Sequence, residues 1–115
     1  HDAIGDLADR VHIGRLIDDQ STASPLDNPM WHALAARARA AYPGASLLPQ
    51  LEIGATDARF FRRRGTVAYG TGLFSADVTY EDMISRFHGN DERIDVESLR
   101  LTTDLWLGVV HDLLG

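Results

Sequence analysis

The chain has 115 residues, a formal net charge of −6 and no cysteine, and these figures exclude several classes of protein. The acidic balance argues against nucleic acid as a partner, because phosphate binding needs a surplus of Lys and Arg on one face. The lack of cysteine excludes disulfides and thiolate zinc sites and fits a reducing cytoplasm. No apolar run approaches the roughly 20 residues that cross a bilayer, and no signal-peptide pattern occurs, so we expect a cytoplasmic protein without a membrane partner.

The N-terminal part predicts a strand followed by a linker. Val11, Ile13 and Leu16 alternate with one slip, which is typical of an edge strand. The periodicity then disappears, and Asp, Ser, Pro and Asn gather as in a linker. We therefore expect a boundary that separates residues 1–23 from a main domain at residues 24–115. The first residue is not Met, so we expect that it is not the natural start of the protein.

Two longer helices are predicted in the main domain. Asn28 and Pro29 combine a capping side chain with a proline at the first helical position, and "YPG" ends that helix near Tyr42. Asp95 caps a closing amphipathic helix. Its apolar positions are spaced as in one helical face: Val96, Leu99, Thr103, Trp106, Val110 and Leu113.

Two apolar runs between these helices predict strands. Residues 46–54 and 66–74 are short and apolar, and Pro49 restricts the first of them to an edge or a break. A helical turn or two lies between the runs and stops at Gly65. Alternating helices and strands favour a sheet in which neighbouring strands are parallel, because parallel strands are joined by crossover helices. The predicted fold class is therefore α/β, with a mixed, mainly parallel sheet and flanking helices.

The stretch "GATDAR" is a candidate anion site. Gly54 lets a ligand approach the backbone, Thr56 or Asp57 caps the following helical turn, and Arg59 could hold a carboxylate through two parallel hydrogen bonds. The alternative is an ordinary capped helix with a solvated arginine. The three arginines at 62–64 cannot all face one site, so they predict a surface patch or salt bridges.

The stretch "HGNDERI" is a candidate metal-binding loop. His88 stands beside a glycine in an irregular segment, where its ring can reach a divalent metal, and Asp91 or Glu92 could orient the ring. A surface histidine in a polar turn is the alternative. One histidine cannot make a site, because zinc takes about four ligands, and no HxH, HxD or HExxH motif occurs here. For the other four histidines we expect surface or packing roles.

Together, "PGASLLPQLEIGATDARFFRRRGTVAYGTGLF" and "RFHGNDERIDVESL" resemble the C-terminal portion of a family of co-catalytic zinc metallopeptidases. The family includes aminoacylases, acetylornithine deacetylases, succinyl-diaminopimelate desuccinylases and glutamate carboxypeptidases. The ordered succession of the two motifs is more specific than either motif alone. The resemblance covers roughly residues 24–114. Residues before that resemble the last strand of the lid domain that the family inserts into its catalytic domain.

The resemblance implies specific roles for four residues. His88 would be a terminal ligand to one of two Zn²⁺ ions, with Co²⁺ or Mn²⁺ as possible substitutes. Arg59, together with Gly54 and Thr56, would bind the free carboxylate of a small peptide or N-acyl amino acid. The full-length enzyme would be a homodimer that cleaves an amide bond next to that carboxylate, by means of a metal-activated water.

The family's other ligands and its general base, a glutamate, have no counterpart in these 115 residues. We therefore expect an inactive C-terminal fragment that holds zinc weakly. Such a fragment would self-associate, because apolar faces meant for the absent half must be covered. Two alternatives remain, namely a non-catalytic carboxylate-binding module and an interaction domain on which His88 is a surface residue.

Overall fold

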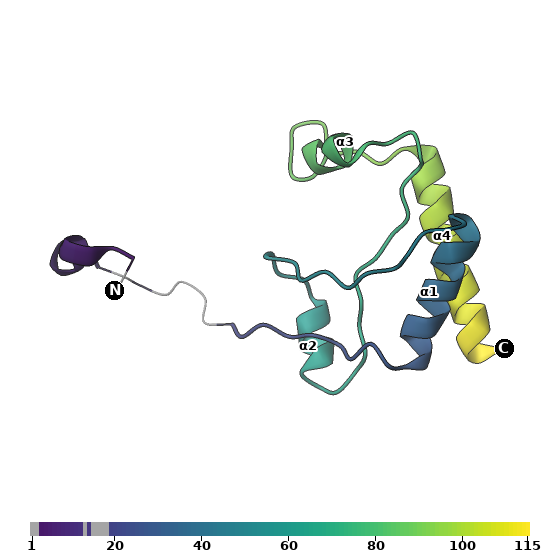
Figure 1. Ribbon diagram of the computed structural model, residues 1–115, viewed down its shortest axis with the longest axis horizontal. Helices are drawn as coiled ribbons and strands as arrows, with labels where there is room; N and C mark the ends of the chain where they lie inside the picture. The colour runs from purple at the N-terminus through teal and green to yellow at the C-terminus, as the bar shows by residue number, and fades with distance from the viewer. Residues whose placement is uncertain (1–2, 13, 15–18) are drawn as a thin grey trace.

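The computed structural model describes residues 3–12, 14 and 19–115, and in these ranges the chain is helical with long extended connections. A 3₁₀ helix, η1 (Gly5–Arg10), is followed by four α-helices (Figure 1). The bounds of the α-helices are α1 (Pro29–Ala41), α2 (Ala58–Arg62), α3 (Tyr80–Ser85) and α4 (Val96–Leu114). None of the helices in the described ranges is long and apolar enough to span a membrane.

The described residues contain no strand, so the prediction of an α/β fold with a mainly parallel sheet is wrong. The predicted first strand lies mostly outside the described residues, and Val11 and His12 at its start are not in a strand. The other two predicted strands, 46–54 and 66–74, fall in segments without regular secondary structure. An apolar run becomes a strand only when a neighbouring strand takes up its backbone hydrogen bonds, and no such neighbour is present among the described residues.

The predicted ends of the long helices are confirmed. The side chain of Asn28 accepts a hydrogen bond from the backbone N–H of Trp31 at 3.0 Å, and Pro29 is the first residue of α1. The side chain of Asp95 accepts from the backbone N–H of Ser98 at 2.8 Å and so starts α4. In both cases a short polar side chain satisfies an amide that has no partner within the helix.

The core lies between α1 and α4, which are the only two described helices that pack against each other. Leu34 of α1 meets Leu105 and Val109 of α4, and all three side chains are almost fully buried. Arg37 and Asp112 form an ion pair across the same helix pair. The core is small for a chain of this length, since the buried hydrophobic residues in the described ranges are only five: Leu34, Ala35, Ala38, Leu105 and Val109.

The extended segment 66–75 runs beside this helix pair and is held mainly by side chains. The hydroxyl of Ser24 both accepts from the N–H of Ala68, at 2.9 Å, and donates to its carbonyl, at 3.0 Å. Thr102 of α4 makes the same pair of bonds with Leu73, at 2.9 and 3.0 Å. Side-chain hydroxyls thus take the place of the partner strand that the sequence pattern predicted, and the segment stays extended without a sheet.

Helix α4 is apolar on two opposite faces. The face toward α1 contains Leu105 and Val109, whereas a second set of apolar side chains, which we call the outer stripe, is exposed. The outer stripe follows helical spacing through Val96, Leu99, Leu107, Val110 and Leu114. The sequence pattern grouped Val96, Leu99 and Val110 into one apolar face without assigning a partner to it, and the structure leaves all three exposed.

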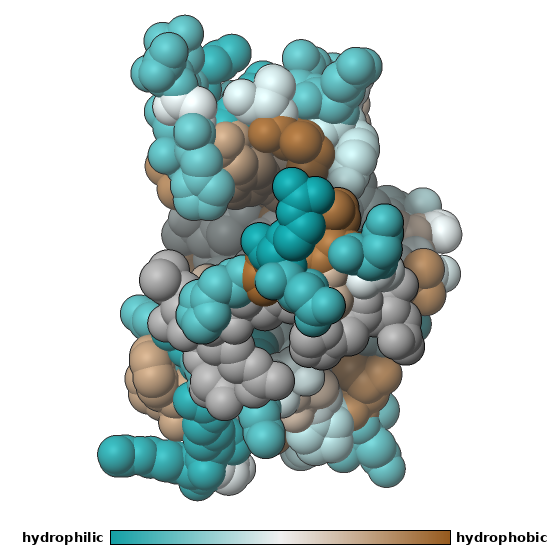
Figure 2. Space-filling view, turned by 90° about the vertical axis from the view of Figure 1, so that its left-hand side faces the viewer, coloured by the Kyte–Doolittle hydropathy of each residue, from teal (hydrophilic) through white to brown (hydrophobic). Residues whose placement is uncertain are grey.

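Apolar side chains also reach the surface elsewhere. Leu48, Leu51 and Ile53 in the first predicted strand are exposed, as are Phe60 and Phe61 of α2. Figure 2 shows hydrophobic residues at the surface between hydrophilic ones on the face turned to the viewer. The radius of gyration is 18.7 Å, whereas a compact domain of this length has about 13 Å. The chain therefore covers its apolar residues incompletely.

Candidate functional site

Helix α2 carries the predicted carboxylate-binding arginine, and in the structure Arg59 is paired with an acidic side chain of the chain itself. Its backbone N–H donates to the carbonyl of Thr56 at 3.2 Å, which forms the turn that opens α2. Its Nε lies 2.9 Å from a carboxylate oxygen of Asp19, and both side chains are 28% exposed. Arg63 contacts the same carboxylate. Arg59 is thus neither solvated nor free, and it engages the type of group that the sequence predicts as its ligand.

The surroundings of Arg59 favour a planar anion at the edge of its guanidinium. The guanidinium carbon lies 4.7 Å from the centre of the Phe60 ring, which supports the arginine from one side. Gly54 and Thr56, the other predicted substrate-binding residues, are exposed. A Cβ atom at Gly54 would meet nothing within 4 Å, so in this structure the glycine is not required for a close approach.

The three arginines after Phe61 have different partners, as predicted from their spacing. Nε of Arg62 donates to the carbonyl of Ala68 at 2.9 Å, and its Nη1 lies 3.1 Å from the hydroxyl oxygen of Thr22. Arg62 therefore ties α2 both to the extended segment and to the region before α1. Arg63 contacts Asp19 as described, and Arg64 is exposed. Gly65 follows with φ of 83°, which confirms it as the stop of this helical turn.

His88 lies in the turn after α3 and has an unusual backbone conformation. Thr79 caps α3 by accepting from the N–H of Asp82 at 3.1 Å, and the chain leaves the helix at Arg86. His88 has φ of 55°, and it is the only non-glycine residue with positive φ in the described part of the chain. Such a conformation costs of order 1 kcal/mol or more and is concentrated at functional sites. The side chain is exposed, with Asp91 and Glu92 exposed nearby in the sequence.

The residues present do not fit a zinc site by themselves. No group of three or more His, Asp or Glu side chains that could hold a metal ion is found in the described residues. His88 and Arg59 also lie in different regions. Figure 1 shows α2 and the turn after α3 well apart, and neither α2 nor α3 packs against another described helix. The structure therefore links Arg59 to Thr56 through one backbone hydrogen bond and does not join either residue to His88 (Figure 1).

Arg86, which precedes this turn, was not identified from the sequence as a functional residue. Its side chain is 20% exposed, and its Nη1 lies 3.2 Å from Asp95. Its Nε is buried and has no hydrogen-bond partner among the described residues. The pKa of Asp95 is held below its usual value, chiefly by the hydroxyl of Ser98, then by the backbone N–H of Ser98 and by the charge of Arg86. The sequence signal for this arrangement is weak, because it consists only of an Arg nine residues before a helix cap.

Comparison with protein-family models, with curated proteins and with solved structures found no match for this chain.

Proposed function

We propose that the chain is part of a metal-dependent amidohydrolase or exopeptidase that cleaves an amide or peptide bond next to a free carboxylate. The observation that carries the proposal is the ordered succession of "GATDAR" and "HGNDERI", with Arg59 and His88 at the positions in these motifs to which the resemblance assigns carboxylate and metal binding. The substrate class is a small peptide or an N-acyl amino acid. The absence of cysteine supports a cytoplasmic location.

The contact of Arg59 with Asp19 supports the proposed role of this arginine. The Nε of Arg59 lies 2.9 Å from an internal carboxylate, and both side chains are only 28% exposed. The contact is an ion pair, since Nε makes no hydrogen bond in the described structure, and it shows that the site accepts a carboxylate next to the guanidinium. A substrate carboxylate would displace Asp19 and take over the contacts of Arg59 and Arg63. Such an anchor fixes the end of the substrate and lowers the entropic part of the activation barrier.

The backbone of His88 supports its proposed role as a ligand to Zn²⁺, or to Co²⁺ or Mn²⁺. The residue has a strained backbone, is exposed and stands next to Gly89, so solvent and a metal ion can reach its ring. Since the described residues supply no further ligands, the remaining ligands and the general base would come from residues outside the 115. On its own the chain is then expected to bind zinc weakly and to hydrolyse nothing.

The test uses the protein encoded by the complete open reading frame. Zinc content and turnover of N-acetyl amino acids are measured for the wild type, for His88→Ala and for His32→Ala, whose ring is exposed on α1. We expect His88→Ala to lose bound zinc and most of its turnover, and His32→Ala to lose neither. Arg59→Met is expected to raise KM by about tenfold or more, because a charged hydrogen bond to the substrate is lost. Unchanged zinc content and turnover in His88→Ala would contradict the proposal.

A second candidate function, a non-catalytic interaction or carboxylate-binding module, is favoured by a specific observation. His88 is exposed and lies apart from Arg59, and the outer stripe of α4 offers an apolar surface. Calorimetry separates the two functions. An acyl amino acid that binds without zinc, with an affinity that zinc does not change, would favour the module. Binding that depends on zinc would favour the enzyme.

A further inference from the structure

A pocket between α3 and the start of α4 lies next to His88 but contains none of the residues considered so far except Arg86 and Glu92. Its volume is about 310 Å³, at the lower end of the range for small-molecule sites. Its walls are mainly apolar and come from three parts of the chain. The apolar lining residues are Phe74, Met83, Phe87 and Ile94, and the charged ones are Arg86, Glu92 and Arg93.

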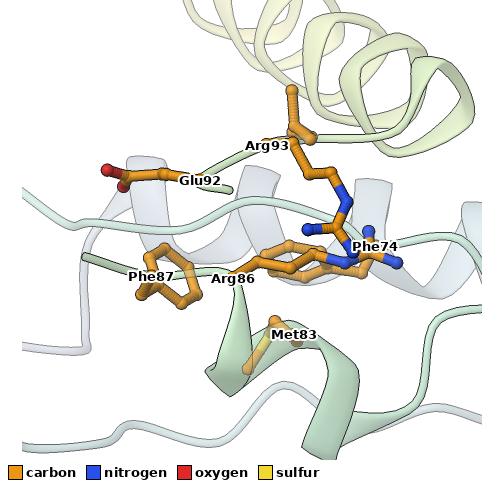
Figure 3. Close-up of a pocket in the computed structure, with 7 residues that line it drawn as sticks. Phe74, Met83, Arg86, Phe87, Glu92 and Arg93 are labelled. Atoms are coloured by element: carbon orange, nitrogen blue, oxygen red, sulfur yellow. The ribbon is translucent and has the colours of Figure 1, made fainter. Parts of the chain in front are cut away.

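The charged groups of the pocket are not balanced. Figure 3 shows the guanidinium groups of Arg86 and Arg93 on the same side of the pocket, near Phe74, whereas the carboxylate of Glu92 points away from them. Arg93 donates from Nη1 to the carbonyl of Asp91 at 2.9 Å, which leaves its charge without a compensating carboxylate in that contact. Guanidinium groups stay protonated at any physiological pH, so the two charges repel each other unless an anion lies between them.

Asp95 compensates this charge only in part. It lies 3.2 Å from Nη1 of Arg86 and at the same time accepts from the N–H and the hydroxyl of Ser98, at 2.8 and 2.7 Å. A guanidinium has five N–H donors, and Nε of Arg86 is buried without a partner in the described structure. Arg86 thus has the carboxylate of Asp95 as its partner, whereas Arg93 contacts only a backbone carbonyl among the described residues. On the side of the pocket away from the carboxylate of Glu92 (Figure 3), Arg93 supplies a positive charge without a carboxylate partner, which suits a monoanion better than a dianion such as phosphate.

We propose that this pocket binds a small monocarboxylate with one apolar arm. The carboxylate lies between Arg86 and Arg93, and the arm lies against Phe74, Met83 and Phe87. The volume limits the arm to the size of a short alkyl chain or a single ring. The site is separate from Arg59, and it is independent of whether His88 binds a metal.

The test follows hexanoate binding to the 115-residue protein by ¹H–¹⁵N NMR, with hexanamide as the uncharged analogue. We expect saturable shifts centred on the amides of Phe87 and Ile94, and an affinity for hexanamide that is lower by about tenfold or more, because a charge-assisted contact is lost. Arg93→Met should weaken hexanoate binding by about tenfold. Arg39→Met removes the same charge from the exposed surface of α1 and should leave binding unchanged.

A second variant keeps the proposal testable if an arginine change disturbs the fold. Met83→Trp fills the pocket from α3, where Met83 is half-buried, and should abolish the shifts while the far-UV circular dichroism stays the same. Two classes of ligand share this chemistry, acylated amino acids and simple apolar acids, and N-acetyl-leucine distinguishes between them. Tighter binding than hexanoate would assign the site to acylated amino acids, and weaker binding would assign it to simple apolar acids. Equal binding of hexanoate and hexanamide, equal losses in Arg93→Met and Arg39→Met, or no saturable shift in the pocket would overturn the proposal.

Discussion

The hydroxyl of Ser98 joins α4 to the extended segment, and its removal is the sharpest test of how this fold is held. Ser98 is fully buried. Its Oγ accepts from the backbone N–H of Ser75 at 2.8 Å and donates to Asp95 at 2.7 Å. In Ser98→Ala the N–H of Ser75, a residue that is itself 8% exposed, loses its partner in a place that water hardly reaches.

The expected loss of stability follows from that buried N–H group. A buried donor without an acceptor costs about 1–3 kcal/mol, and alanine regains at most about 0.5 kcal/mol through its higher helix propensity. The net decrease in the free energy of unfolding is therefore about 0.5–3 kcal/mol. Urea unfolding followed by circular dichroism at 222 nm measures it.

Thr103→Ala is the matched control for Ser98→Ala. It removes a hydroxyl from the same helix, but this hydroxyl is exposed and donates to the carbonyl of Leu99 at 2.8 Å. We expect a change within about 0.5 kcal/mol, as for other surface substitutions. If Ser98→Ala is no more destabilising than Thr103→Ala, hydroxyl groups do not hold the extended segment and the account of the missing sheet is refuted.

Three further predictions concern the core, acid stability and association. Leu34→Ala should lower the free energy of unfolding, measured by urea titration, by about 2–5 kcal/mol. Leu48 is 78% exposed, so Leu48→Ala should change this free energy by less than about 0.5 kcal/mol. Hydrogen bonds from Ser98 lower the pKa of Asp95, so the stability that this carboxylate contributes is fully present above the ordinary carboxyl pKa and is lost as the pH falls through the lowered pKa. Asp95→Asn keeps a capping side chain but does not titrate, so it should reduce the loss of stability in an acid titration. An acid-unfolding profile equal to that of the wild type would contradict this. Leu107→Glu, in the outer stripe, should shift a self-associating wild type toward monomer in sedimentation velocity, and a monomeric wild type would refute this.

The helix ends could be predicted from sequence because they depend on local chemistry. Asn28 and Asp95 each accept from an amide three residues further on, and Gly65 takes a φ that other residues avoid. These interactions need only neighbours in the chain. A pattern of residue types at fixed spacing therefore contains all the information required.

The sheet could not be predicted because strand formation depends on distant partners. Residues 66–74 have the composition of a strand, yet Ser24 and Thr102 supply the groups that bond to their backbone. The buried face of α4 could not be identified from the sequence for the same reason. Its apolar residues occupy more than one helical face, and the sequence pattern does not say which face meets α1.

The candidate site was predicted from sequence as separate motifs, and the structure does not join them into one arrangement. The pattern around Arg59 predicted a substrate carboxylate as its partner, whereas in the structure Arg59 is paired with the carboxylate of Asp19 from the chain itself. The involvement of Arg86 depends on the return of the loop after α3 to the N-cap of α4, where Arg86 meets Asp95, and no local pattern contains this contact. Likewise, the strained backbone of His88 is a property of the turn as a whole.

The two apolar faces of α4 connect the stability of the chain with its proposed activity. A helix that is apolar on opposite faces is stable when both faces are covered, and α1 covers only one of them in the described structure. The protein surface that covers the outer stripe would begin at Val96, next to the cap Asp95 and a few residues after His88. If His88 binds a metal as proposed, such a surface would bring the further ligands to it without any change in α1 or in the core. The same contact would then raise stability and complete the proposed metal site, so zinc affinity and resistance to urea should increase together when that surface is present.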